Sequence, residues 1–174
     1  MRDGPFEIET PRLILRKLGV ADAAFILDLL NQESFLRFIG DRGVRSIADA
    51  REYIAKGPMA SYERFGFGLY LVSLREAGSP VGICGLVKRP GLDDADLGFA
   101  LLPQHCSRGY AREAAVAVLE HGHRAFGLKR IVAITAPGNF KSIAVLERLG
   151  FLFERLVHLA EHDDGLQLFA RDES

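Results

Sequence analysis

The segment from Asp96 to Thr135 constrains the fold more than any other part of this sequence. An apolar run at Asp96–Leu102 is followed by a long amphipathic helical pattern at Tyr110–Phe126, and then by a compact apolar run at Arg130–Thr135. A strand–helix–strand unit of this kind makes its two strands parallel, with a right-handed crossover. The helix therefore begins at the carboxyl end of the first strand, where α/β units commonly bind ligands.

The remaining elements do not alternate regularly, which favours an α+β fold with a mostly antiparallel sheet and helices on its faces. Hydrophobic patterning predicts further strands at 12–16, 67–74, 80–88, 152–160 and 166–171. It predicts further helices at 22–31, 46–56 and 140–149. We expect Gly57-Pro58 to stop the second of these helices, with helix resuming to about Arg64, and Asp163-Asp164-Gly165 to turn the last hairpin. Gly150 is placed as a left-handed helix cap, and Phe151 is placed to pack back on that helix.

Composition narrows the class of protein. A chain of 174 residues with 48% hydrophobic and 26% charged residues is typical of a globular protein, and we expect residues 1–174 to form a single domain. The net charge of -1 argues against a nucleic-acid partner, and there is no apolar run of the roughly 20 residues that a membrane span needs. Cys84 and Cys106 are too few for a disulfide framework. With no apolar centre of a secretory signal in the first residues, these features predict a reducing, cytoplasmic location.

A candidate anion-binding turn, Ser107-Arg108-Gly109-Tyr110-Ala111, joins the first strand of the unit to its helix. The unpaired N–H groups and partial positive charge of a helix start can hold a phosphate. Gly109 lets the backbone approach such a ligand closely, and Arg108 and Arg112 add positive charge. An ordinary helix start, with Ser107 as the N-cap and two solvated arginines, explains the same residues equally well on spacing alone.

Other parts of the sequence help to decide between an anion-binding turn and an ordinary helix start. Arg108-Gly109-Tyr110-Ala111, followed by Glu113-Ala114, resembles the coenzyme A pyrophosphate loop of the GNAT acetyltransferases, and most of all its RimJ/RimL branch. The loop departs from that branch at Cys106 and Ser107, where Trp and Gly are usual. Four further segments resemble the same branch in the same order, so that the resemblance covers nearly the whole chain: Glu9–Arg16, Pro80–Leu86, Asp96–Phe99 and Asn139–Phe151.

The resemblance implies an N-acetyltransferase that moves an acetyl group from acetyl-CoA to a primary amine. It implies direct attack in a ternary complex, with a protein N-terminus or a small-molecule amine as the acceptor. The implied fold has a mostly antiparallel sheet of six to seven strands, with a central parallel pair that splays apart and about four helices. The pantetheine arm would lie between the splayed strands, next to the backbone of Leu101 and Leu102, and the pyrophosphate would lie on Ser107–Arg112.

Four side chains are candidates for roles around the reacting thioester. Asn139 is a good N-cap, and in the family an Asn at this position bonds pantetheine; one side chain can do both. Ser142 is either a solvated first-turn serine or, as the resemblance implies, the hydroxyl that protonates the departing thiolate. Asp96 is either a candidate general base acting through water or a strand carboxylate paired with arginine. Lys141 is expected at the surface, within reach of a coenzyme phosphate.

The remaining residue patterns give no further clear assignment of function. The terminal-hairpin residues Glu161, His162 and Asp163, together with Tyr70 and Phe38, are open to two interpretations, as parts of an acceptor pocket or as structural residues. Two other interpretations are rejected: His121 and His123 point in different directions on a helix and make a poor metal pair, and Cys106 lacks a partner for nucleophilic catalysis. We therefore expect no metal, no nucleic acid and no membrane partner. A coenzyme A-binding regulatory domain without turnover is the alternative function, and a monomer and a homodimer are both open.

Overall fold

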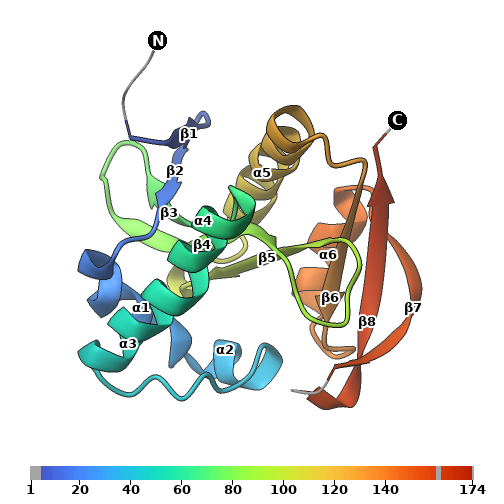
Figure 1. Cartoon of the computed structure of the whole chain (residues 1–174), viewed down its shortest axis with the longest axis horizontal. Coiled ribbons are helices and arrows are strands. Elements are labelled where there is room, and N and C mark those ends of the chain that lie inside the picture. The colour runs from blue at the N-terminus through green and yellow to red at the C-terminus, as the bar shows by residue number, and fades with distance from the viewer. Residues whose placement is uncertain (1–4, 160–161, 174) are drawn as a thin grey trace.

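The computed structural model describes residues 5–159 and 162–173, and this part of the chain contains a single mixed sheet of eight strands. The strands lie in the order β1-β2-β3-β4-β5-β6-β8-β7 (Figure 1). Their bounds are β1 Glu7–Glu9, β2 Leu13–Lys17, β3 Leu69–Leu74, β4 Pro80–Val87, β5 Ala95–Leu101, β6 Arg130–Thr135, β7 Leu152–Leu159 and β8 His162–Asp172. Only β5 and β6 pair in parallel, which confirms the mostly antiparallel sheet with one parallel pair.

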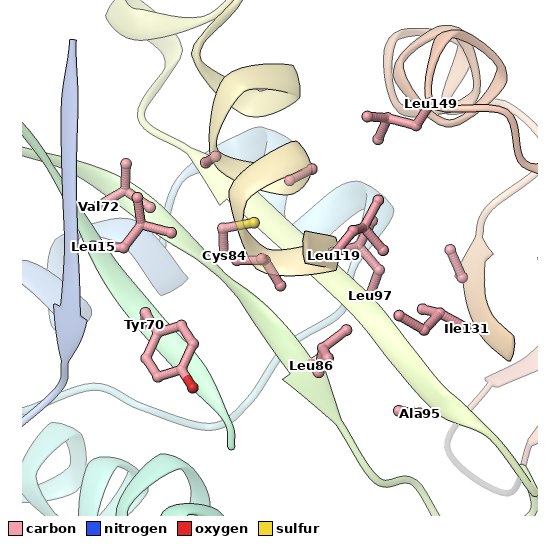
Figure 2. Close-up of a cluster of buried hydrophobic side chains, with 14 of the residues drawn as sticks. Leu15, Tyr70, Val72, Cys84, Leu86, Ala95, Leu97, Leu119, Ile131 and Leu149 are labelled. Carbon is pink, nitrogen blue, oxygen red and sulfur yellow. The ribbon is translucent and has the colours of Figure 1, made fainter. Parts of the chain in front are cut away.

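Helices cover both faces of the sheet (Figure 1). Their bounds are α1 Ala23–Leu30, α2 Glu33–Phe38, α3 Ile47–Ile54, α4 Ala60–Phe65, α5 Tyr110–Phe126 and α6 Phe140–Arg148. A larger core lies between the sheet and α5 with α6, where Leu86, Leu119 and Ile131 meet (Figure 2). A second core lies on the opposite face, under α1 and α3. In the described part of the chain, no helix combines the length and the apolar character that a membrane crossing requires.

Helix α5 packs closely on the middle of the sheet. Its buried stripe falls at helical spacing on Ala114, Ala115, Val118, Leu119 and Gly122. A Cβ at Gly122 would lie 2.7 Å from a methyl carbon of Leu86 on β4, so a larger residue would force either the Leu86 side chain or the helix to shift. The amino end of α5 is thereby fixed relative to β4 and β5.

The end of α6 confirms the predicted cap. Gly150 has a φ of 85°, its N–H donates to Glu147 and the N–H of Phe151 donates to Leu146. Phe151 is 1% exposed and lies in the larger core, so the cap also anchors the start of β7.

Four details differ from the sequence-based expectations. Strand β1 and helix α2 were not predicted, because each is short and has little apolar periodicity. Gly57-Pro58 does not stop the helix: a π-helical turn at Ala55–Met59 links α3 to α4, and in such a wider turn the missing N–H of Pro58 is tolerated.

The predicted turn at Asp163-Asp164-Gly165 is wrong. These residues lie in β8, whose register shifts against β7 so that Val157 pairs with Leu166 and Leu159 with His162. Gly165 has a φ of 79°, and a positive φ is what a residue in such a bulge often needs.

The parallel pair separates soon after it begins. Only Ala95 with Ile131 and Asp96 with Val132 are paired, although β5 continues to Leu101 and β6 to Thr135. Beyond Asp96 the two strands leave a gap in the middle of the sheet. This confirms the expected splay and places it beside the start of α6.

Candidate functional site

A cavity occupies the gap between the separated strands β5 and β6, and residues from both faces of the sheet line it. Its walls include residues of β5 from Asp96 to Ala100 and of β6 from Ala133 to Thr135. On the α6 side it is lined by Asn139, Ser142 and Leu146. On the other side it is lined by Phe35, Phe38, Ile39, Arg42 and Tyr53. Two molecules that approach from opposite faces can therefore meet inside the sheet.

Asp96 lies at the closed end of this gap and is 1% exposed. Its Oδ2 accepts a hydrogen bond from Arg89 Nε at 2.5 Å, and its Oδ1 accepts one from the N–H of Ile134 at 3.3 Å. The second bond satisfies a β6 backbone donor just past the last β5–β6 pair. Asp96 thus bridges β5 and β6 where their backbone pairing ends, in addition to presenting a carboxylate to the cavity.

Burial governs the protonation of this carboxyl. It raises the pKa of Asp96 to about 6, against the opposing effects of Arg89 and of the backbone hydrogen bond. Arg89 has a side chain only 25% exposed and also lines the cavity. Sequence reasoning left open an arginine partner for Asp96 but did not identify Arg89, which precedes β5 by only a few residues.

The turn before α5 has a backbone unlike that of a side-chain-capped helix. Ser107 has a φ of 61° and Gly109 a φ of 82°, both in the left-handed region. The N-cap is Gly109, and no side chain caps the helix there. The alternative that Ser107 is the N-cap is therefore wrong. Among the described residues, no side chain accepts from the first N–H groups of α5, which leaves them suited to an anion.

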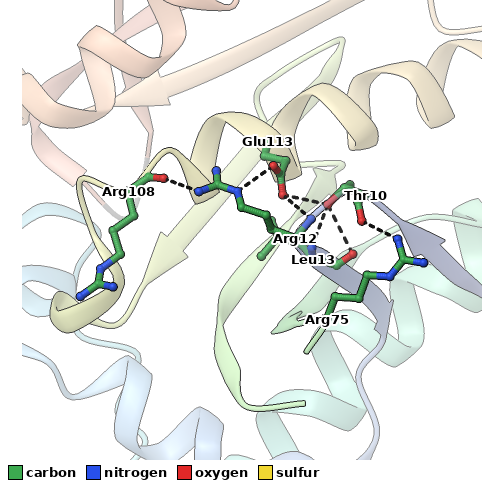
Figure 3. Close-up of polar contacts among 6 residues, drawn as sticks. All are labelled: Thr10, Arg12, Leu13, Arg75, Arg108 and Glu113. Carbon is green, nitrogen blue, oxygen red and sulfur yellow. Dashed lines mark hydrogen bonds and ion pairs between the residues drawn. The ribbon is translucent and has the colours of Figure 1, made fainter. Parts of the chain in front are cut away.

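A polar network ties this turn to the start of β2 (Figure 3). Glu113 accepts hydrogen bonds from Thr10 Oγ1 at 2.9 Å and from Arg12 Nε at 3.0 Å. Arg12 also donates through Nη1 to the carbonyl of Arg108 at 2.9 Å, and its guanidinium lies 4.5 Å from the centroid of the Tyr110 ring. The sequence motifs around Thr10 and Glu113 were noted separately, but contact between residues so far apart in the chain was not predicted.

The backbone of β5 offers hydrogen-bonding groups toward the gap at alternate residues. The N–H of Leu102 donates to Val81 on β4, and its carbonyl accepts from His105. Both backbone groups of Leu102 therefore already have partners within the chain, and its N–H faces β4, contrary to the expectation for this residue. Since the direction alternates along a strand, Leu101 and Phe99 direct their N–H and C=O groups toward β6.

The start of α6 brings two predicted residues to the cavity. Asn139 caps the helix by accepting a hydrogen bond from the N–H of Ser142 at 3.4 Å, so its structural role is present. Asn139 and Ser142 both line the cavity that contains Asp96. Lys141 is exposed and is not part of the cavity wall, as its expected surface position requires.

The residues considered for an acceptor pocket lie in different parts of the structure. Phe38 lines the cavity, whereas Tyr70 is 2% exposed in the larger core, where its ring stacks on Tyr62. Glu161, and the side chains of His162 and Asp163, lie outside what the structure describes. Sequence reasoning missed Thr135, a buried residue in the cavity wall.

Neither histidine of α5 belongs to a cluster of possible metal ligands among the described residues. His121 packs against Phe6 and Phe126 at centroid distances of 5.0 and 5.5 Å, and burial lowers its pKa. The described residues contain no group of three or more His, Cys, Asp or Glu side chains that could hold a metal ion. Cys106 is half-buried and its Sγ lies 3.6 Å from the carbonyl of Leu102.

Comparison with known proteins agrees with this geometry. The family model described as "Acetyltransferase (GNAT) domain" matches residues 12–152. An uncharacterized N-acetyltransferase, YnaD of Bacillus subtilis, is 29% identical over 143 residues, which cover 82% of this chain and 81% of that protein. An acetyltransferase structure from Agrobacterium tumefaciens aligns with a TM-score of 0.82 and 26% identity, covering 99% of this chain and 98% of the other. A structure of RimL, an alpha-N-protein acetyltransferase in complex with coenzyme A, shares the fold with a TM-score of 0.83 at 20% identity, covering 97% of this chain and 98% of the other.

Proposed function

The chain belongs to the GNAT acetyltransferases, and we propose that it transfers an acetyl group from acetyl-CoA to a primary amine by direct attack. The observation that carries this proposal is the cavity between β5 and β6, which is lined from both faces and has a buried carboxylate at its closed end. A direct transfer needs both substrates in one space, and a cavity that is lined from both faces of the sheet supports this arrangement.

The residues present fit coenzyme A. We assign the pyrophosphate to the turn Ser107–Arg112, where Gly109 replaces a side-chain cap and the backbone N–H groups are available. We assign the pantetheine arm to the backbone of β5 at Phe99 and Leu101, and to Asn139. Lys141 is exposed at the start of α6, close to Asn139, and is the candidate for a further phosphate contact.

Bound acetyl-CoA supplies a thioester carbon that a neutral amine can attack. A backbone N–H of β5 that points into the gap, at Phe99 or Leu101, can donate a hydrogen bond to the thioester oxygen and so stabilise the charge that develops there. The hydroxyl of Ser142, at the first turn of α6, can donate a proton to the departing sulfur.

Asp96 is the candidate for the group that takes the proton of the amine. With a pKa of about 6 it is ionised at neutral pH, yet its pKa is close enough to neutrality for it to act as a base. Both carboxylate oxygens already accept one hydrogen bond, and a carboxylate oxygen can accept more than one. A water molecule in the cavity could carry the proton to it.

The acceptor is a protein N-terminus or a small amine, and an assay can separate these classes. The purified protein would be mixed with acetyl-CoA and with a panel of free amino acids, polyamines and short peptides with free N-termini, and the release of thiol would be followed. Amine-dependent thiol release, with an acetylated product seen by mass spectrometry, is the expected result. Acetyl-CoA binding without such release across the panel would instead indicate the coenzyme A-binding regulatory domain.

Two serine variants sharpen this test. Ser142→Ala should lower turnover more than it lowers the affinity for acetyl-CoA, because only the proton to the leaving sulfur is lost. Ser79→Ala is the matched control, because Ser79 is exposed in the loop between β3 and β4 and does not line the cavity. It should leave both the turnover and the affinity for acetyl-CoA unchanged. An unaltered turnover in Ser142→Ala would remove the proposed role of this hydroxyl.

A further inference from the structure

Thr135 has a buried hydroxyl that the proposed chemistry has not used so far. It is the last residue of β6, is 7% exposed and lines the cavity between β5 and β6. Its Oγ1 is buried and has no hydrogen-bond partner among the described residues. Buried side-chain hydroxyls in folded proteins nearly always have a partner, so this exception calls for a ligand or a water.

The position of Thr135 explains why its hydroxyl faces the α6 side of the cavity. Ile131 and Ala133, which alternate with Thr135 along β6, belong to the core under α5 and α6. Thr135 therefore points to the same face of the sheet. This is the face from which Asn139 and Ser142 reach the cavity.

Strand β8, which pairs with β6, carries a second buried polar atom without a partner in the described part of the chain. Gln167 on β8 pairs with Thr135 in the register, and its side chain shares the face of Phe169, which also belongs to that core. Its Oε1 is likewise buried without a partner among the described residues. The described structure thus leaves two polar atoms unsatisfied on the α6 face of the sheet, at paired positions of β6 and β8, and of these two residues Thr135 lines the cavity.

We infer that Thr135 donates a hydrogen bond to the sulfur of the coenzyme, as a second hydroxyl beside that of Ser142. This inference rests on the proposed function, because it takes the α6 side of the cavity as the place of the thioester. When the amine nitrogen bonds the acetyl carbon, the carbon–sulfur bond breaks and its electron pair stays on sulfur. Sulfur takes its proton from Ser142, which regains one from water; the nitrogen gives up its own proton toward Asp96, which returns it to water; and Thr135 keeps its proton throughout. A donor held without other partners costs no reorganisation when that charge develops.

The inference predicts an unusual combination of effects for Thr135→Val, which keeps the shape of the side chain and removes the hydroxyl. The free protein should melt at the same temperature as the wild type or higher, because a buried donor without a partner is lost. The affinity for coenzyme A should fall only a few-fold, since the sulfur of a neutral thiol is a weak hydrogen-bond acceptor. The turnover number should fall roughly tenfold, because the bond strengthens as charge develops on the departing sulfur, while KM for the amine stays unchanged. Thr135→Ser, which retains the hydroxyl, should restore both.

The decisive probe is desulfo-coenzyme A, in which the thiol is replaced by hydrogen. Thr135→Val should bind this analogue as tightly as the wild-type protein does, because the atom that Thr135 contacts is missing from it. An equal loss of affinity for coenzyme A and for the analogue would overturn the inference, because the contact would then lie elsewhere on the coenzyme. So would an unchanged affinity and turnover.

A lower melting temperature of free Thr135→Val would also overturn it, because the hydroxyl would then have a structural partner such as Gln167. Gln167→Leu is the companion variant: the inference expects it to leave the effect of Thr135→Val on coenzyme A affinity unchanged. These results are separable from a failure of the proposed function. If the wild-type protein binds no coenzyme A, the proposed function fails; if it binds and turns over but Thr135→Val behaves identically, only this inference fails.

Discussion

The buried carboxyl of Asp96 makes a quantitative prediction about how stability depends on pH. Its pKa is raised from the ordinary 3.8 to about 6 by burial, against the pull of Arg89. At about 1.4 kcal/mol for each pKa unit, this corresponds to about 3 kcal/mol of stability that is lost when Asp96 ionises. Because the folded protein holds this proton more tightly than the unfolded chain, that stability is present at low pH and is lost as the pH rises through about 6.

Asp96→Asn removes this titration and leaves the other groups in place. The free energy of unfolding of both proteins would be measured by urea denaturation at several pH values, and the variant's value subtracted from that of the wild type. Any constant effect of the amide on packing cancels from the shape of this difference. The difference should fall by about 2 kcal/mol between about pH 4.5 and about pH 7.5, the part of the total that lies in this window. The turnover of Asp96→Asn should fall as well, if Asp96 takes the amine proton.

Asp22 provides a control of opposite sign. Burial raises its pKa, but the hydrogen bonds from Arg16 and from the N–H of Gly19 outweigh this effect and hold it below its ordinary value. The same subtraction with Asp22→Asn should therefore give a difference that rises with pH at the acid end. A flat or rising difference for Asp96→Asn would show instead that Arg89 compensates fully for the burial of Asp96.

Three further predictions test the frame around the site. Gly109→Glu should weaken coenzyme A binding strongly, since it places bulk and negative charge at a left-handed turn near Arg12; calorimetry that finds full affinity in a folded variant would contradict the assignment. Glu113→Gln should lower the free energy of unfolding, measured by urea denaturation, by about 1–2 kcal/mol and should also weaken coenzyme binding, because it weakens the hydrogen bonds from Thr10 and Arg12. No change in either quantity would show that Glu113 does not support the turn before α5. Gly122→Val should lower the free energy of unfolding by about 1–3 kcal/mol, because the larger side chain overpacks against Leu86. Gly138→Ala is the control and should be tolerated, because nothing in the described structure lies within 4 Å of its new Cβ; equal stability of the two variants would contradict the close packing of α5.

The central unit of the fold could be predicted from the sequence because its signals are local. The apolar periodicity of α5, the compact run of β6 and the Gly150 cap depend on neighbouring residues, and the structure confirms each of them. The register of the last hairpin could not be predicted, because Asp163-Asp164-Gly165 suits a bulge as well as a turn. Nor could the continuity of α3 and α4, since a π-helical turn around Pro58 depends on tertiary packing.

The site was predictable in its parts and not in its contacts. Gly109, Asn139 and Ser142 carry recognisable local motifs, so their positions at helix starts followed from sequence alone. The contact of Asp96 with Arg89 depends on how β4 and β5 pair, and the burial of Thr135 arises only when β5 and β6 meet and then separate. No periodicity within one segment encodes such a contact between segments.

A crystal structure of the protein with coenzyme A would show directly where the coenzyme binds. We expect the pyrophosphate on the turn Ser107–Arg112, the pantetheine arm between β5 and β6, and the sulfur beside Thr135 and Ser142. A second groove, along α5 and the first two strands, shares Gly109 and Arg112 with this turn and carries further arginines and glutamates. A pantetheine arm that follows that groove and leaves the gap between β5 and β6 empty would show that the gap is not the site of acetyl transfer.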